Sequence, residues 1–243
     1  MHASGRQTVT VEYIETAALD ADGLALLSQT LSDEERARAA RFHFERDRSV
    51  YIVGHALMRD MLARAVGGSA HDFAFTTGAH GKPEAVLAAS APRLRINLSH
   101  TRGLAAVAMT QDVDVGVDVE WMSRDSDLLN IAERFFAVDE RRQLALAAET
   151  DRRDCFFAFW TLKEAYIKAI GLGLAMPLAD FSFQLETLRI AFADHVDDDP
   201  DDWHFLHRRL SHDHALSLAV RHKGGPAPDV QITPTDLARL LRG

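Results

Sequence analysis

The chain has 243 residues, of which 47% are hydrophobic, so it can bury a substantial core as one large domain or two small ones. Its formal net charge of -9 argues against a sequence-independent nucleic-acid binder, because such proteins neutralise phosphates with excess Lys and Arg. Cys155 is the only cysteine, no apolar run approaches the roughly 20 residues needed to cross a bilayer, and the start lacks a secretory pattern, so we expect a cytoplasmic protein without membrane insertion.

The first half of the chain shows helix signals followed by strand signals. Ser32 and Glu35 form a capping box that should begin an Arg-rich helix, and a second helix over 50–65 should stop at Gly67. We expect strands at 9–14, 73–75, 94–98 and 104–109, with a turn over 78–83. The arginines between 36 and 48 form a local basic cluster, which is either an anion site or a solvated helix face.

The second half repeats this order of signals. It begins with a strand over 113–119, and Gly171 should end the strongest of its helices. The predicted helices are 128–136, 140–148 and 155–170, and the predicted strands are 181–185, 188–192, 203–210 and 215–220. The segment 223–228 is typical of a linker. After it, Thr233 as N-cap and Pro234 as the first helical residue, with Asp236, should open one short helix.

Three pairs of short matching segments occur in the same order in both halves. They are 65–67 with 169–171, 72–75 with 180–183, and 98–100 with 210–212. Their nearly constant separation favours a duplicated α+β unit. We expect an N-terminal half over 1–112, a C-terminal half over 113–222, a tail over 223–243, and a site in the cleft between the halves.

Two carboxylates share one face of the predicted strand 113–119. Valines alternate there with polar residues, so the strand would point its valines inward and Asp118 and Glu120 outward, about 7 Å apart. Such a pair can bracket Mg²⁺, which prefers oxygen ligands. The alternative is a solvent-facing acidic edge.

The predicted helix 155–170 is apolar on nearly all sides, and its only charges are Lys163, Glu164 and Lys168. Buried charges need partners, a metal or a ligand. An ordinary ion pair between Glu164 and Lys168, four residues apart, is the simpler interpretation. It does not account for Lys163 or for the acidic strand upstream.

Two upstream motifs carry polar groups at turns or strand ends. Gly81-Lys82-Pro83 is a turn with a cation, and on its own it indicates no more than a turn. Asn97-Leu98-Ser99-His100 offers hydroxyl, backbone N–H and imidazole donors that could bind phosphate, although a single histidine is usually a surface or core residue.

In this order, these segments resemble the 4′-phosphopantetheinyl transferase superfamily, in its larger monomeric, Sfp-like type. The resemblance runs from about Arg38 to Phe183 and is most specific in 116–120 and 160–171. It implies two similar α+β subdomains, each a small antiparallel sheet with helices, related by a pseudo-two-fold with the active site between them. It also implies transfer of 4′-phosphopantetheine from coenzyme A to a serine of an acyl or peptidyl carrier protein, giving the holo carrier and 3′,5′-ADP.

The resemblance also assigns roles to individual residues of the chain. Mg²⁺, with Mn²⁺ as an alternative, would be held by Asp118, Glu120 and Glu164, with Glu164 as general base and Lys168 assisting departure of 3′,5′-ADP. The residues implied in coenzyme A binding are Arg38, Arg46, Lys82, Pro83, Ser99, His100, Lys163 and Lys168. Val50 stands where some relatives carry a basic residue, so the residues that bind the 3′-phosphate stay open.

The region between the two metal motifs is similar to the family's carrier-docking region. It includes Arg134-Phe135-Phe136 and Glu140-Arg141-Arg142, although phenylalanines in an amphipathic helix are more often core. Two rival functions remain, a magnesium-dependent phosphohydrolase acting on a nucleotide pyrophosphate and a non-catalytic carrier-binding domain. The preferred carrier and its pathway, in fatty-acid, polyketide or nonribosomal peptide synthesis, stay open.

Overall fold

The computed structural model describes residues 6–77, 83–124 and 126–242, and its elements follow the predicted order. The first half contains β1 (Thr8–Glu15), α1 (Ala21–Gln29), α2 (Asp33–Ala39), α3 (Glu45–Val66), β2 (Ala74–Thr77), β3 (Pro83–Val86), β4 (Leu94–Thr101) and β5 (Leu104–Gln111). The second half contains β6 (Val115–Trp121), α4 (Leu128–Phe135), α5 (Val138–Leu146), α6 (Glu149–Ile170), β7 (Phe181–Gln184), β8 (Arg189–Phe192), β9 (Trp203–Arg209) and β10 (His214–Arg221). The tail forms β11 (Asp229–Pro234) and α7 (Leu237–Leu240).

The two halves have the same topology, which agrees with the predicted duplication. One main sheet has the order β1-β5-β4 and the other has the equivalent order β6-β10-β9. α3 and α6 each have 22 residues and end at glycines with positive φ, Gly67 at 80° and Gly171 at 71°. Each helix is followed by a 3-10 turn, 70–72 or 178–180, and a two-stranded hairpin, β2-β3 or β7-β8. The third sequence match is not equivalent, because 98–100 lies within β4 whereas 210–212 follows the end of β9.

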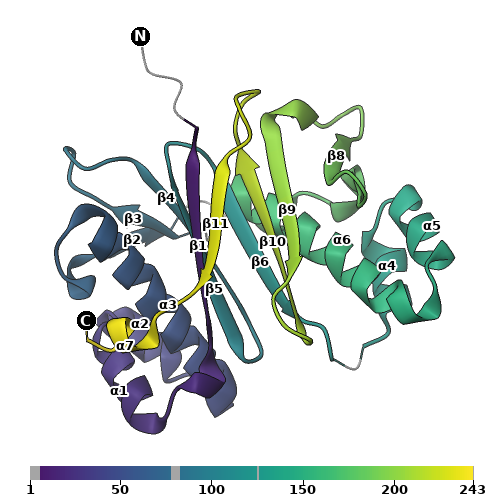
Figure 1. The fold of residues 1–243 in the computed structure, drawn as a ribbon. Helices are drawn as coiled ribbons and strands as arrows, with labels where there is room; N and C mark the ends of the chain where they lie inside the picture. The colour runs from purple at the N-terminus through teal and green to yellow at the C-terminus, as the bar shows by residue number, and fades with distance from the viewer. Residues whose placement is uncertain (1–5, 78–82, 125, 243) are drawn as a thin grey trace.

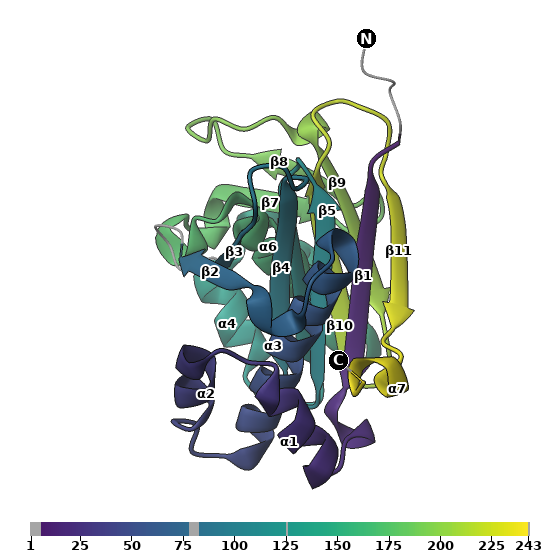
Figure 2. The same ribbon diagram turned by 90° about the vertical axis from the view of Figure 1, so that its left-hand side faces the viewer.

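The molecule has four layers, with the two sheets in the middle and the helices outside (Figure 1). Apolar residues of β1, β5, β6 and β10 form a core between the sheets, which includes Val115, Val117 and Val119. Opposite faces of the sheets pack against α3 and α6. Figure 2 shows α3 crossing in front of β4 and β5. β6 is covered on one face by the core between the sheets and on the other by α6.

A buried cation anchors each long helix to the turn that follows it. In α3, the Arg59 side chain is 1% exposed and pairs with Glu35 at 2.8 Å, and its guanidinium donates to the carbonyls of Ala70 and Phe73. In α6, Lys163 is fully buried, pairs with Glu140 at 2.8 Å, and donates to the carbonyls of Leu178 and Phe181.

The capping glutamates complete these anchors. Glu35 lies at the start of α2 and accepts from the backbone N–H of Ser32, as the capping box predicts. Glu140 holds the same place in α5 and accepts from the N–H of Ala137. Each ion pair therefore ties a long helix to the helix before it.

The tail returns to the first half of the chain. β11 pairs in parallel with β1, so a strand that was not expected follows directly after the predicted linker 223–228. The predicted helix start at Thr233 and Pro234 is corrected, because both lie in β11. Asp236 is the N-cap of α7, where its carboxylate accepts from Arg239 N–H. Within the described ranges, none of the helices has the length and apolar character required of a membrane span.

Candidate active site

The candidate site lies where α6 crosses β6, and a glycine allows them to approach closely. A Cβ on Gly116 would stand 2.0 Å from the Ala165 carbonyl oxygen and 2.4 Å from the Ala169 nitrogen. Because alternate residues of a strand share a face, Asp118 and Glu120 follow Gly116 on the side that faces α6. The sequence expectation that they point outward is corrected, because Asp118 is 4% exposed beneath α6.

Asp118 takes part in a buried polar network rather than an acidic edge. Its Oδ1 accepts from Lys168 Nζ at 2.6 Å and from Ser99 Oγ at 3.0 Å. Lys168 also donates to Ser99 Oγ at 2.8 Å, so it pairs with Asp118 in place of the expected i,i+4 bond to Glu164. Within the described part of the chain, Asp118 Oδ2 is buried without a hydrogen-bond partner.

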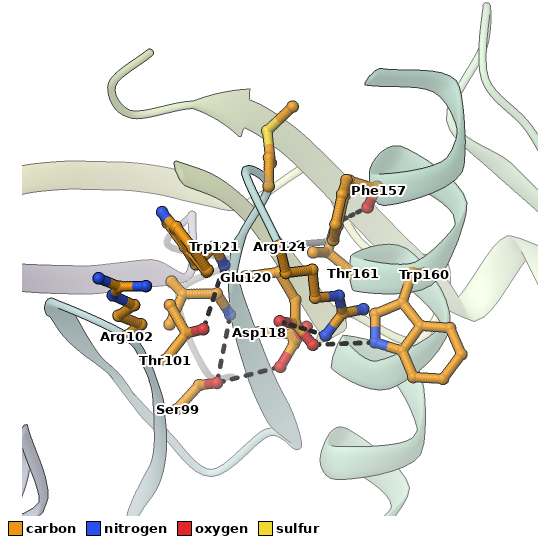
Figure 3. Close-up of polar contacts among 12 residues, drawn as sticks. Ser99, Thr101, Arg102, Asp118, Glu120, Trp121, Arg124, Phe157, Trp160 and Thr161 are labelled. Carbon is orange, nitrogen blue, oxygen red and sulfur yellow. Dashed lines mark hydrogen bonds and ion pairs between the residues drawn. The ribbon is translucent and has the colours of Figure 1, made fainter. Parts of the chain in front are cut away.

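Glu120 lies one pleat further along β6, and each of its oxygens has a partner (Figure 3). Oε1 accepts from Trp160 Nε1 at 3.0 Å, and Oε2 accepts from Arg124 at 3.2 Å. Burial and the negative charge of Asp118 raise the pKa of Glu120 to about 7, although Arg124 and Trp160 oppose the shift. Burial and the neighbouring Asp118 thus make the charged form of Glu120 less favourable than that of an exposed glutamate.

Glu164 projects from α6 toward the same group. Burial and then the Asp118 charge raise the pKa of Glu164, and Lys168 partly opposes this. No hydrogen bond or ion pair joins the Glu164 carboxylate to another described side chain. Burial also raises the pKa of Asp118 despite Lys168. The Asp118 charge therefore acts on both other predicted metal ligands, and burial raises the pKa of all three.

The donor set fits Mg²⁺ in chemistry but is not preassembled. Carboxylate oxygens are the ligands that Mg²⁺ prefers, and the buried Asp118 Oδ2 lacks the partner that such an atom normally has. Among described residues, no three His, Cys, Asp or Glu side chains are arranged to hold a metal ion. Asp118 Oδ1 instead forms an ion pair with Lys168. The metal set Asp118, Glu120 and Glu164 stays a prediction.

A wall of basic and aromatic side chains from the first half lies around His100, near enough to Lys168 for its charge to act on His100. His100 lies on β4, with its ring 6.4 Å from that of Tyr51, and Arg38 lies over Tyr51 at 5.8 Å. The Tyr51 ring also lies 4.1 Å from that of His55. Partial burial, then the charges of Lys168, His55 and Arg38, lower the pKa of His100 to about 4. This wall is suited to anionic phosphates.

The structure corrects the expected phosphate contact of Lys163. Its side chain has no exposed surface, and its ammonium donates to Glu140 and two backbone carbonyls, which uses all its donors. Trp160, Glu164 and Lys168 recur at intervals of four residues, so their side chains lie on one face of α6. Lys163 lies on another face and anchors the fold.

The remaining predicted coenzyme A residues differ in what the structure says of them. Lys82 lies outside the described residues, and Pro83 begins β3. Arg46 is exposed, lies 4.8 Å from the Phe44 ring and approaches Asp47 at 3.6 Å. Arg38, His100 and Lys168 are brought near one another. Their roles in binding coenzyme A stay predictions.

Ser99 and His100 point to opposite faces of β4, as neighbouring residues in a strand must. His100 faces α3, whereas the Ser99 side chain is buried beside β6. The Ser99 hydroxyl is bonded inside the molecule, and the expectation that Ser99 and His100 hold the nucleotide end stays a prediction.

The region predicted to dock carriers divides into core and surface. Phe136 is buried and stacks on Phe156 at 5.2 Å, and Glu140 is the partner of Lys163. Phe135 is 40% exposed. With it, the exposed apolar residues on α4 and α5 are Leu129, Val138 and Leu146.

Sequence reasoning missed several residues of this site. Trp160 and Arg124 hold Glu120, and Trp160 could have been found from its spacing of four from Glu164. Tyr51 and His55 also share a helix face at a spacing of four. Arg124 gives no comparable signal in the sequence.

Comparison with known proteins supports the same family over both halves. Residues 114–219 match the 4′-phosphopantetheinyl transferase superfamily, and residues 20–112 match the N-terminal domain of 4′-phosphopantetheinyl transferases. The chain is 36% identical to 4′-phosphopantetheinyl transferase HetI of Nostoc sp., over 61% of this chain and 63% of that protein. It is 32% identical to a phosphopantetheinyl transferase of Thraustochytrium sp., over 90% of this chain and 79% of that protein.

The chain thus spans under two thirds of the length of the first relative. A solved structure, Thermotoga maritima holo-[acyl-carrier-protein] synthase (AcpS), is 29% identical over 46% of this chain and 64% of that chain, with a TM-score of 0.37, too low to argue from. The family assignment rests on the sequence matches, which extend across both halves. This chain belongs to the 4′-phosphopantetheinyl transferase superfamily.

Proposed function

We propose that this protein transfers the 4′-phosphopantetheine arm of coenzyme A to a serine hydroxyl of an acyl or peptidyl carrier protein. The main support is the meeting of Asp118 and Glu120 from β6 with Glu164 and Lys168 from α6, opposite the basic wall around His100. One side supplies carboxylates for a cation and the other supplies donors for phosphates.

In this proposal, Asp118, Glu120 and Glu164 would hold Mg²⁺, with Mn²⁺ as an alternative. When bound, the ion supplies neutralisation of the pyrophosphate charge. The serine oxygen of the carrier attacks the β-phosphorus while the bond to the leaving 3′,5′-ADP oxygen breaks. Positioning and charge neutralisation do most of the work in such transfers.

Glu164 is the proposed general base, which takes the proton from the serine hydroxyl. Its raised pKa makes it a better proton acceptor than an ordinary exposed carboxylate. Lys168 is proposed to stabilise charge on the departing 3′,5′-ADP, and His100 and Arg38 to bind its phosphates.

The proposed carrier-docking surface consists of Leu129, Phe135, Val138 and Leu146 on α4 and α5, near Arg134 and Arg142. These apolar side chains are exposed, and both arginines are exposed between them. An acidic carrier would be attracted to such a local surface despite the negative total charge of this protein. We propose that it acts as a monomer in the cytoplasm.

The test is incubation with coenzyme A, Mg²⁺ and a panel of apo carrier proteins, read by the mass of each carrier. A mass gain of one phosphopantetheine is expected, and Glu164→Gln should abolish it. Glu149→Gln, which changes an exposed glutamate at the start of the same helix, is the matched control. An unmodified serine across a broad panel would contradict the proposal. Release of free phosphopantetheine without a carrier would favour the phosphohydrolase alternative.

A further inference from the structure

β4 and β6 are neighbouring strands of different sheets, and side chains rather than a backbone ladder join them. Alternate residues of β4 each accept from one backbone N–H of β6. Asn97 Oδ1 accepts from Val117 at 2.8 Å, Ser99 Oγ from Val119 at 3.2 Å, and Thr101 Oγ1 from Trp121 at 3.1 Å. We call Asn97, Ser99 and Thr101 the side-chain ladder.

The side-chain ladder fixes how the two halves align. β6 pairs with β10 along its other edge, so the N–H groups of 117, 119 and 121 depend on β4 for partners. Buried N–H groups without partners are costly, and a one-residue shift of β6 along β4 would leave all three N–H groups without these acceptors. The observed register is therefore the one that keeps all three bonds of the side-chain ladder.

Ser99, the middle residue of the ladder, is also bonded to the candidate site. Its hydroxyl donates to Asp118 Oδ1, and its two lone pairs can accept from Val119 N–H and Lys168 Nζ. These bonds use the full capacity of a hydroxyl, and the side chain is buried. Figure 3 shows Ser99 next to Thr101, with its hydroxyl directed at Asp118.

We propose that Ser99 is a positioning residue that couples the register between the halves to the placement of Asp118 and Lys168. The inference rests on the proposed function, since it assigns Asp118 to the metal. Ser99 acts through Asp118 and Lys168, and its side chain does not itself bind coenzyme A.

The experiment compares Ser99→Ala with Thr101→Val, because each removes one hydroxyl from the ladder but only the first loses a contact with Asp118. Mn²⁺ affinity is measured by titration of the carrier-free protein, with thermal unfolding and kcat and KM for coenzyme A alongside. Ser99→Ala should weaken Mn²⁺ binding about 10- to 100-fold and lower kcat, as loss of a group that orients a metal ligand does. Thr101→Val should lower the unfolding temperature and leave Mn²⁺ affinity within about twofold.

Ser99→Thr keeps the hydroxyl and should restore Mn²⁺ affinity. Equal Mn²⁺ affinity in Ser99→Ala and the unaltered protein would overturn the inference, as would equal losses in Ser99→Ala and Thr101→Val. If the unaltered protein neither binds Mn²⁺ nor modifies a carrier, the proposed function fails. A crystal structure of Ser99→Ala then decides the inference alone, because an Asp118 carboxylate still fixed on Lys168 in the same orientation would refute it.

Discussion

The two halves carry the same arrangement of charges, yet only one has unbalanced carboxylates. Glu12 of β1 pairs with the fourth residue of β5, and Asp118 of β6 pairs with the fourth residue of β10. Counted from Glu45 and Glu149, Arg64 and Lys168 are each the twentieth residue of their helices. Each equivalent pair is joined at 2.6 Å.

The halves differ in what surrounds these pairs. In the first half, Glu12 and Asp60 both contact Arg64 and also Arg239, which α7 brings in from the tail. Two carboxylates thus meet two guanidinium groups. Glu120 pairs with the second residue of β10. In the first half, the residue of β1 that pairs with the second residue of β5 is Ile14.

In the second half, three carboxylates meet two cations. Lys168 pairs with Asp118 and Arg124 with Glu120, which leaves the Glu164 carboxylate without such a pair among described residues. Acidic residues on this scaffold are therefore not enough to indicate a cation site. What distinguishes the candidate site is the deficit of positive charge.

The sharpest way to break this comparison is to remove the equivalent acid from each half. Asp118→Asn should reduce transfer to the carrier on the order of a thousandfold, because it removes charge needed to hold the cation. Glu12→Gln should change kcat by less than about threefold and lower thermal stability. Mass spectrometry of the carrier over time measures both. Similar losses of transfer from the two variants would show that the halves do not differ as described.

The second comparison removes the capping glutamate from each helix anchor. Glu140→Ala should lower the free energy of unfolding by about 3–5 kcal/mol, since it strands the buried Lys163 charge. Glu35→Ala should cost less, about 2–3 kcal/mol, because the Glu35 side chain is 12% exposed. Urea unfolding at one pH measures the difference. A larger loss for Glu35→Ala would contradict the ranking by burial.

The third prediction concerns the pH dependence of the first-half anchor. Burial alone would raise the pKa of Glu35, but bonds from His55, Ser32 N–H and Arg59 outweigh it and lower the pKa to about 2. A folded-state pKa below the usual 4.5 adds stability above pH 4.5 that is lost as the pH falls toward 2. The expected loss is about 3 kcal/mol. Glu35→Gln should flatten the unfolding free energy in this window, and an unchanged slope would refute the assignment.

The smallest predicted effect tests how closely each helix approaches its sheet. Gly116→Ala should destabilise by about 1–3 kcal/mol, because its Cβ would meet the backbone of α6. Gly54→Ala, on α3, should cost under about 1 kcal/mol, since its nearest neighbour is the adjustable Leu98 side chain at 2.8 Å. Thermal unfolding compares them. Equal shifts would mean that α6 has more freedom to move than the structure indicates.

Much of the fold could be predicted from local signals. Hydrophobic periodicity located most helices and strands, and glycines placed the ends of α3 and α6. α1 was missed, because it has only nine residues and includes Gly23, which has a low helix propensity. β11 was missed because a strand that pairs with one far away in the chain leaves little local signal beside a proline-rich segment.

The site was predictable in residue type but less so in partners. The buried charges on α6 indicated that partners must exist, which the structure bears out for Lys163 and Lys168. The sequence does not show which lysine pairs with a carboxylate of the site. Lys163 pairs with Glu140 and anchors the fold, whereas the crossing of α6 with β6 brings Lys168 to Asp118. Ser99 and His100 were both expected to bind the nucleotide because the predicted strand ended at 98, whereas β4 continues to Thr101 and turns their side chains to opposite faces.

The pairing of β11 with β1 has a consequence for how the protein is made. β1 leaves the ribosome well before β11 and receives this outer neighbour only after both halves have been synthesised, because Thr8 pairs with Asp229. Until then one edge of the first sheet stays open to other chains, as unpaired strand edges are. Nascent chains stalled before β11 should therefore be more prone to association than the finished protein.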